Sequence, residues 1–155
     1  MEIRRAKECD LGGIGSLLSQ VLEVHHKGRP DLFHTGVKKY TDEEVLDILS
    51  DSCRPIFVAV EEKKVLGYAF CIFQEVKGSH ILKDNKTLYL DDLCVDEAAR
   101  GKSVGKALYE FLRAYAKEEG CYNLTLNVWN FPESALAFYE KMGMQVQKIG
   151  MECIL

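Results

Sequence analysis

A basic, glycine-containing segment opens the most clearly amphipathic helix that the sequence predicts. The segment reads Arg100-Gly101-Lys102-Ser103-Val104-Gly105-Lys106. Helix N-termini present free backbone N–H groups and the positive end of the helix dipole, and glycine lets a ligand approach the backbone closely. In a chain of net charge −4, this concentration of positive charge predicts an anion site, with phosphate as the ligand.

Two well-known phosphate loops do not fit this segment. A Walker A loop ends in Gly-Lys-Ser, as Gly101-Lys102-Ser103 does, but Asp96 stands where that loop needs its first glycine. A carboxylate at that position would face the phosphates of a nucleotide. The dinucleotide fingerprint Gly-x-Gly-x-x-Gly is absent from this turn, and no early βαβ unit precedes it.

The segment resembles the acetyl-CoA loop of the GNAT family of N-acetyltransferases, Arg/Gln-x-x-Gly-x-Gly/Ala after a long strand. Arg100 and Gly105 fit, while Ser103 stands at the usual central glycine. A second family signature, Asn-x-x-Ala-x-x-Phe-Tyr-x-x-x-Gly-Phe, is similar to residues 130–144. Its matching positions are Ala135, Phe138, Tyr139 and Gly143, whereas Pro132 replaces the usual Asn and Asn130 lies two residues earlier.

Hydrophobic periodicity and turn residues predict the element order β-α-α-β-β-β-α-β-α-β. The strands are expected at 2–5, 55–61, 65–76, 87–95, 123–129 and 144–154, and the helices after Asp10, after the capping box 41–44, at 104–120 and at 132–142. This order gives an α/β layered (α+β) fold with a mixed, mostly antiparallel sheet and one β-α-β crossover. The resemblance, which covers essentially the whole chain, implies the acyl-CoA N-acyltransferase fold with helices on both faces.

The resemblance also implies a binding mode for acetyl-CoA as co-substrate, without a metal. The pantetheine arm is expected between two splayed strands, beside the backbone of Leu93, Cys94 and Val95. The loop 100–106 would hold the pyrophosphate, and Asn130 is a candidate for a further contact.

Amine acetylation needs a group that removes a proton from the amine and one that returns a proton to the departing thiolate. The resemblance implies Tyr139 as the acid. Asp91 and Asp92 are the candidate bases, acting directly or through water. Strand alternation predicts that these two carboxylates face opposite sides of the sheet. Residues 89–93 are similar to a segment of spermidine/spermine acetyltransferases, and this favours Asp91.

The loop 24–40 lies where such proteins build their acceptor site. His25, His26, Asp31, Phe33 and Tyr40 fall within it and could shape a pocket for an amine. We expect a bacterial-type enzyme that acetylates a primary amine of a small molecule by direct attack. A protein lysine or N-terminus as acceptor, and a CoA-binding regulatory module without turnover, are the alternatives.

Length and composition fit one domain spanning residues 1–155. The mildly acidic balance argues against nucleic acid as a partner, and no apolar run has the length of a membrane span. No signal peptide is evident, and the six cysteines form no CxxC pair, so we expect reduced, small buried thiols in a cytoplasmic protein. The apolar segment 146–155 suggests a possible homodimer.

Overall fold

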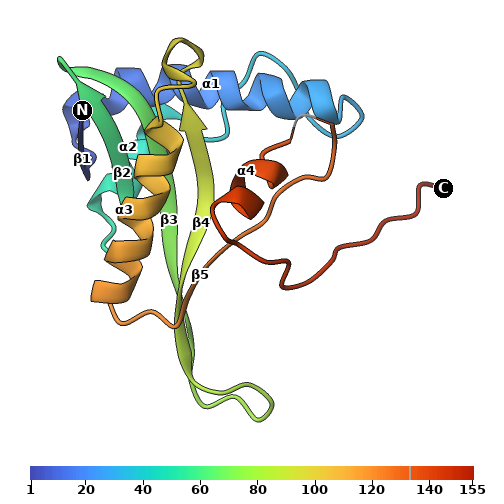
Figure 1. Ribbon diagram of the computed structural model, residues 1–155. Helices are drawn as coiled ribbons and strands as arrows, with labels where there is room; N and C mark the ends of the chain where they lie inside the picture. Colours follow the sequence, from blue (N-terminus) through green and yellow to red (C-terminus); the bar gives the residue numbers. More distant parts are fainter. Residues whose placement is uncertain (133) are drawn as a thin grey trace.

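Within residues 1–132 and 134–155, which the computed structural model describes, five strands form one mixed sheet (Figure 1). The strand order follows the chain: β1 (Glu2–Arg5), β2 (Ile56–Glu61), β3 (Lys64–Val76), β4 (Asn85–Val95) and β5 (Asn123–Leu126). Neighbouring strands are antiparallel except β4 and β5, which are parallel. The predicted mixed, mostly antiparallel sheet is confirmed.

Helices cover both faces of this sheet (Figure 1). On one face, α1 (Leu11–Gly28) and α2 (Asp42–Ser50) bury Ile14 and Val45 against Tyr68 and Phe70 of β3. On the other face, α3 (Val104–Glu118) and α4 (Leu136–Lys141) enclose a second core. Because β4 connects through α3 to the parallel β5, the sheet contains the predicted β-α-β crossover.

Local sequence explains where α2 and α3 begin and how α3 packs. The predicted capping box starts α2: the Thr41 hydroxyl accepts from the Glu44 amide at 3.2 Å, and the Glu44 carboxylate accepts from the Thr41 amide at 2.7 Å. Gly67 of β3 lets α3 lie close to the sheet, because a Cβ there would stand 3.1 Å from Leu108 and 3.2 Å from Val104 of that helix. The capping box thus begins a helix on one face of the sheet, and Gly67 allows α3 to pack closely on the other face.

Three element boundaries differ from prediction. Helix α1 continues to Gly28, so residues 24–28 of the predicted loop 24–40 are helical. Strand β5 ends at Leu126 instead of residue 129, and α4 begins only at Leu136. Pro132 therefore lies in the turn before α4 and is not the first residue of a helix.

The predicted final strand, 144–154, is wrong. Residues 144–155, called the C-terminal arm below, form no helix or strand in the fully described stretch after Gly143. A strand needs a hydrogen-bonded neighbour, and the arm runs away from the sheet (Figure 1).

All six cysteines, which lie within the described residues, are free. Cys71 and Cys94 are buried and Cys121 is half-buried, but Cys9, Cys53 and Cys153 are exposed. The expectation of buried thiols is therefore wrong for these three. In the described part of the chain, none of the helices combines the length and the apolar character needed to cross a membrane.

Candidate active site

Strands β4 and β5 part midway along β4. Their register runs from Thr87↔Asn123 to Leu90↔Leu126, and no further pair follows among the described residues. Beyond Leu90, residues 92–95 of β4 pair with β3 and, within the described residues, have no partner in β5, so the edge of β4 that faces β5 is left open. This gap is the splay that the resemblance implied.

A β-bulge marks the point where the gap begins. Phe70 of β3 pairs with Asp92, and the next residue, Cys71, pairs with Leu90, so Asp91 is one residue extra on β4. Bulges redirect side chains and are enriched beside active sites. Asp91 is thus the first residue of β4 after its pairing with β5 ends.

Asp91 receives hydrogen bonds from two residues of the segment before α2. The Tyr40 phenol donates to Asp91 Oδ2 at 2.7 Å. The Lys39 ammonium donates to the same oxygen at 2.9 Å and to the Asp91 backbone carbonyl at 3.2 Å. Burial and the Asp91 carboxylate raise the pKa of Tyr40, which keeps its phenol protonated as a donor. The Asp91 carboxylate is therefore held in place but faces partly exposed surroundings.

Asp92 lies in a drier environment. Its side chain is buried and accepts a hydrogen bond from the Tyr68 phenol at 2.9 Å. Burial raises the pKa of Asp92 to about 6, although the charge of Lys39 and the Tyr68 hydrogen bond oppose that rise. Near neutral pH, this carboxyl group therefore titrates close to the working range of a general base.

Asp91 and Asp92 do not face opposite sides of the sheet, which corrects the prediction from strand alternation. Tyr40, the partner of Asp91, stacks on Phe70 with ring centroids 5.3 Å apart. Tyr68, the partner of Asp92, packs edge-on against the same Phe70 ring, with ring centroids 5.0 Å apart. Because the bulge inserts one residue, both carboxylates lie on the face covered by α1 and α2.

Tyr139 of α4 approaches β4 from the other face. It is buried in the core beneath α3, with Tyr109 at 6.5 Å between ring centroids. Burial is the main cause of its raised pKa, and the charge of Asp92 adds to it. The phenol therefore holds its proton at neutral pH, as a general acid must.

The predicted phosphate loop joins β4 to α3 through a short 3₁₀ helix (Glu97–Ala99). Gly101 has φ +79° and Ser103 has φ +60°, so both lie in the left-handed region. Ser103 is the residue before the first turn of α3, whose amides Val104, Gly105 and Lys106 point out of the helix end. A serine carries a steric cost here that the family's usual glycine avoids.

The positive side chains of this loop are available to an anion. Arg100 and Lys106 are exposed, and the ion pairs that they form with described residues are long, 3.8 Å to Glu97 and 3.7 Å to Glu110. Lys102 is exposed as well. Exposed pairs of this kind are weak and easily exchanged for a phosphate group.

The loop, β4 and α4 meet at Gly105. A Cβ on Gly105 would stand 3.5 Å from Val95 and 3.6 Å from the Phe138 ring, so these three residues are in close contact. Leu93 is half-buried beneath α3, whereas Cys94 is buried on the α1 face. The structure thus brings the two sequence signatures together at the open part of β4.

Asn130 is exposed in the turn before α4 and is not among these contacts. Its neighbour Phe131 packs against Gly28 at the end of α1, where a Cβ would stand 2.6 Å from the ring. This part of the turn therefore lies against α1, and a contact between Asn130 and the cofactor stays a prediction.

An aromatic cluster lies at the α1 end of the site. Phe33 contacts His25 at 5.1 Å and Trp129 at 5.3 Å between ring centroids, and the Arg29 guanidinium lies 5.9 Å from the Trp129 ring. Burial, aided by the charge of Lys39, lowers the pKa of His25. His26 Nδ1 lies 2.7 Å from the Phe33 carbonyl oxygen, so it fixes the loop. Asp31 is paired with Arg29 and points to solvent.

Sequence reasoning missed Lys39 and Tyr68. Neither lies in a motif, and each meets its aspartate only through the folded sheet. The extra residue on β4 carried no sequence signal either, because an Asp-Asp pair in a strand fits alternation equally well.

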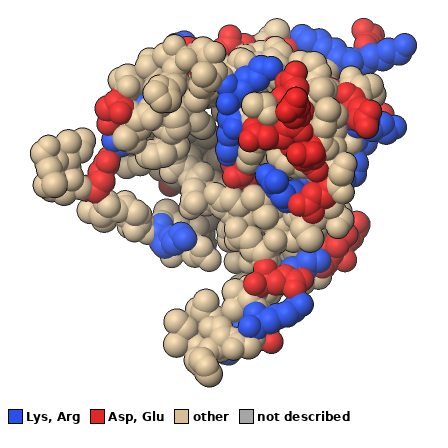
Figure 2. Space-filling model, turned by 180° about the vertical axis from the view of Figure 1, so that it is seen from behind, with Lys and Arg blue, Asp and Glu red and all other residues tan. Residues whose placement is uncertain are grey.

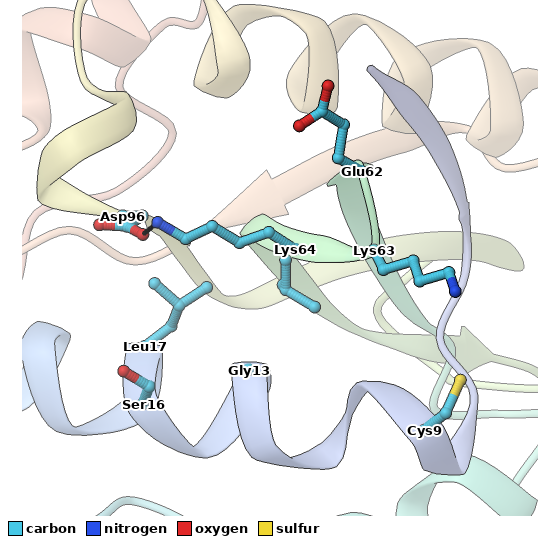
Figure 3. Close-up of a pocket in the computed structure, with 9 residues that line it drawn as sticks. Cys9, Gly13, Ser16, Leu17, Glu62, Lys63, Lys64 and Asp96 are labelled. Atoms are coloured by element: carbon cyan, nitrogen blue, oxygen red, sulfur yellow. Dashed lines mark ion pairs between the residues drawn. The ribbon is translucent and has the colours of Figure 1, made fainter.

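Two surface cavities lie outside this gap. The larger, about 460 Å³, is lined by Cys9 and Gly13 near the start of α1 and by the β2–β3 turn (Figure 3). Lys64 forms an ion pair with Asp96 across it at 2.8 Å. The charge of the Asp96 carboxylate is therefore already balanced by Lys64. Neither Asp91 nor Tyr139 lines either cavity. The acid–base groups gather at the gap instead.

Comparison with known proteins identifies the family. The family model described as the acetyltransferase (GNAT) family matches residues 13–144. The chain belongs to the GNAT acetyltransferase family. The predicted family and fold are thereby confirmed, and GNAT acetyltransferases use acetyl-CoA as co-substrate.

Named relatives and solved structures agree with this assignment. A thialysine N-epsilon-acetyltransferase from Bos taurus is 27% identical over 92% of this chain and 83% of its own. A glucosamine 6-phosphate N-acetyltransferase from Arabidopsis thaliana is 38% identical, but the match spans only 43% of this chain and 42% of that enzyme. The tetramutant of the BH1408 protein from Bacillus halodurans superposes with a TM-score of 0.94, 31% identity and full coverage of both chains.

These two relatives are named for transfer of an acetyl group to the amine of a small molecule, which supports N-acetyl transfer as the reaction of this family member. Among the described residues, no group of three or more His, Cys, Asp and Glu side chains converges as a metal site would require.

Proposed function

We propose that this protein transfers the acetyl group of acetyl-CoA to the primary amine of a small molecule by direct attack. The observation that carries the proposal is the convergence at the β4–β5 gap. Asp91 and Asp92 lie on one face, Tyr139 approaches from the other, and the cationic loop before α3 lies at the far end.

Bound acetyl-CoA supplies the acetyl thioester. Asp91 removes a proton from the acceptor ammonium, directly or through water, because it is the more exposed carboxylate. The Asp92 carboxyl group, with its raised pKa, lies beside it and is the second candidate for that role. The Tyr139 phenol returns a proton to the departing thiolate. The amides at the start of α3, with Arg100, Lys102 and Lys106, hold the pyrophosphate.

We further propose that the acceptor carries an anionic group as well as its amine. The support is Lys39, whose ammonium already occupies the Asp91 carboxylate in the free protein. A simple diamine would have to compete with Lys39 for that carboxylate. A carboxylate or phosphate on the acceptor would instead bind Lys39, draw it away and leave Asp91 free for the amine. Glucosamine 6-phosphate and thialysine, named for relatives, are amines of this kind.

The experiment is a thiol-release assay with acetyl-CoA and matched acceptors. Lysine and 1,5-diaminopentane differ only in the carboxylate, and glucosamine 6-phosphate and glucosamine differ only in the phosphate. We expect kcat/KM to be at least tenfold higher for the anionic member of the preferred pair. Lys39→Met should reduce that ratio, and Lys39→Arg, which keeps the charge, should retain most of it.

The possible outcomes distinguish three parts of the proposal: the reaction, the role of Lys39 and the type of acceptor. Turnover with equal rates on both members of each pair would refute the role of Lys39 but leave the reaction intact. Acetyl-CoA binding by calorimetry without turnover on any amine would favour a regulatory module. Turnover only on peptides would favour a protein lysine or N-terminus as acceptor.

We also propose that the working form is a homodimer in a reducing, cytoplasmic setting. The C-terminal arm supports the first point, because its large apolar side chains are exposed in the single chain. The six free cysteines support the second, because thiols persist in reducing compartments.

A further inference from the structure

The segment between β4 and the loop 100–106 is held at Asp96 by three different contacts. The Asp96 amide donates to the Leu66 carbonyl oxygen of β3 at 2.9 Å. Its Oδ1 accepts from the Ala98 amide at 3.0 Å and so caps the short 3₁₀ helix. Its Oδ2 lies 2.8 Å from the Lys64 ammonium. Asp96 therefore uses its amide and both carboxylate oxygens to fix the direction in which the chain leaves β4.

Two further contacts hold the same segment. From α1, Gln20 Oε1 accepts from the Glu97 amide at 3.2 Å. Ala99 is buried in the core together with Leu66 and with Val104, the first residue of α3. Residues 100–103 are exposed. They thus form a short bridge between two anchored points, the segment 96–99 and Val104.

This bridge must present its groups to a pyrophosphate in one arrangement. Gly101 and Ser103 have φ of +79° and +60°, so the backbone turns sharply just before α3. The chain has a net charge of −4, and on the face shown in Figure 2 acidic and basic side chains lie next to one another. Affinity for a pyrophosphate therefore depends on the placement of the loop amides and cations more than on a general attraction.

We propose that Lys64 and Gln20 are positioning residues for the cofactor. They contact the segment 96–97, and through it they hold the amides at the start of α3 in the arrangement that binds the pyrophosphate of acetyl-CoA. Lys64 comes from β3 and lines the larger surface cavity (Figure 3), and Gln20 comes from α1. The proposal rests on the proposed function, because it takes the loop 100–106 as the pyrophosphate site.

The exposure of the Lys64 side chain separates this role from a contribution to folding. That side chain is 61% exposed, whereas the Asp96 side chain is 14% exposed. Exposed ion pairs contribute little to the free energy of unfolding. Loss of Lys64 should therefore leave thermal unfolding nearly unchanged, and its effect should be seen in the affinity of the loop for a pyrophosphate.

The first test compares two acetyl donors. Acetyl-CoA and S-acetylpantetheine share the thioester and the pantetheine arm, but only acetyl-CoA carries the pyrophosphate. Lys64→Met should raise the KM for acetyl-CoA about fivefold and leave kcat unchanged, because the ion pair fixes the loop and does not touch the reacting atoms. The same variant should match wild type with S-acetylpantetheine. An equal loss with both donors would show a general structural role and overturn the proposal.

The second test is calorimetry with adenosine 3′-phosphate 5′-diphosphate, which carries the pyrophosphate without the pantetheine arm. Lys64→Met should weaken its binding by the same factor as that of acetyl-CoA. Gln20→Leu, which removes the oxygen that accepts from the Glu97 amide, should weaken both ligands in the same direction. Unchanged binding of this fragment to both variants would overturn the proposal.

Two lysine variants are the matched controls. Lys64→Arg keeps the charge beside Asp96 and should retain most of the wild-type affinity. Lys63→Met removes the neighbouring charge, which points away from Asp96 (Figure 3), and should bind acetyl-CoA as wild type does. Equal weakening by Lys63→Met and Lys64→Met would assign the effect to general positive charge and refute positioning.

The wild-type chain distinguishes failure of this proposal from failure of the proposed function. If it does not bind acetyl-CoA, the proposed function fails together with this proposal. If it binds acetyl-CoA and Lys64→Met binds it equally well, only the role of Lys64 is refuted.

Discussion

The two halves of the site along β4 are built in different ways. The cofactor half consists of consecutive residues, 96–106, whose backbone amides and positive side chains face one helix end. The acceptor half consists of side chains from three separate segments: Lys39 and Tyr40 before α2, Tyr68 of β3 and the two aspartates of β4.

This difference explains how each half tolerates change. A site made of backbone depends on φ and ψ, so replacement of one side chain alters it modestly. A site made of converging side chains depends on each hydroxyl and carboxylate, so a single deletion removes a function. Substitutions in the two halves should therefore differ in size and in the parameter that they change.

The largest effect is expected in the acceptor half. Asp91→Asn removes the proton acceptor but keeps the shape and an oxygen for Tyr40. We expect kcat/KM to fall on the order of 10³-fold, within the usual contribution of a general base. Steady-state kinetics check this. The matching Asp92→Asn should lower activity less, and the reverse order would make Asp92 the base.

Tyr139→Phe should come next. Removal of the phenol should lower kcat on the order of 10²-fold and change the KM for acetyl-CoA little, because the ring still fills its place in the core. Turnover that is unchanged would remove Tyr139 from the mechanism. A rise in KM alone would make it a binding residue.

A stability measurement separates the two aspartates. Burial raises the pKa of Asp92 to about 6, so ionisation of this carboxyl group costs more in the folded protein than in the unfolded chain. The free energy of unfolding is therefore highest at low pH, where the group is neutral in both states, and it declines as pH rises through about 6. Asp92→Asn should therefore be more stable than wild type by about 3 kcal/mol at pH 7.5, and equal to it near pH 3.5. Urea unfolding at both pH values checks this.

Asp96 is the control with the opposite sign. Its pKa is lowered, mainly by the hydrogen bond with Lys64, so its stabilising effect is present above pH 4 and is lost as pH falls further. Asp96→Asn should therefore lower stability at pH 7.5. If both variants shift stability in the same direction, the burial argument for Asp92 fails.

The smallest effect is expected in the cofactor half. Ser103→Gly relieves a residue with φ +60° and should stabilise the protein by about 0.5–1 kcal/mol, with slightly tighter acetyl-CoA binding. Ser103→Ala keeps the strained backbone and should give no gain. Thermal unfolding and calorimetry check both, and equal behaviour of the two variants would assign the effect to the hydroxyl.

The cofactor half could be predicted from the sequence because its residues are consecutive, whereas the acceptor half, made of residues far apart in the chain, could be predicted only in part. The loop 100–106, Tyr139 and the start of α3 are local patterns, and the structure brings them together as expected. Lys39 and Tyr68 could not be predicted, because their contacts with the aspartates span distant positions in the chain. The opposite-face prediction failed because alternation assumes an uninterrupted ladder. The final strand failed because residues 144–155 run away from the sheet and pair with none of its strands (Figure 1).

The extra residue on β4, Asp91, shifts the alternation of side chains between the two faces of the sheet. Before it, Leu88 and Leu90 point toward α3; after it, Leu93 and Val95 do so. Deleting Asp91 would therefore remove the bulge and a carboxylate together without turning any other residue of β4. Regular alternation from Leu90 would still place Asp92 and Cys94 toward α1 and Leu93 toward α3. The sheet itself thus has no need of the extra residue, and the bulge serves the site, because it presents a second carboxylate beside Asp92 where β4 and β5 part.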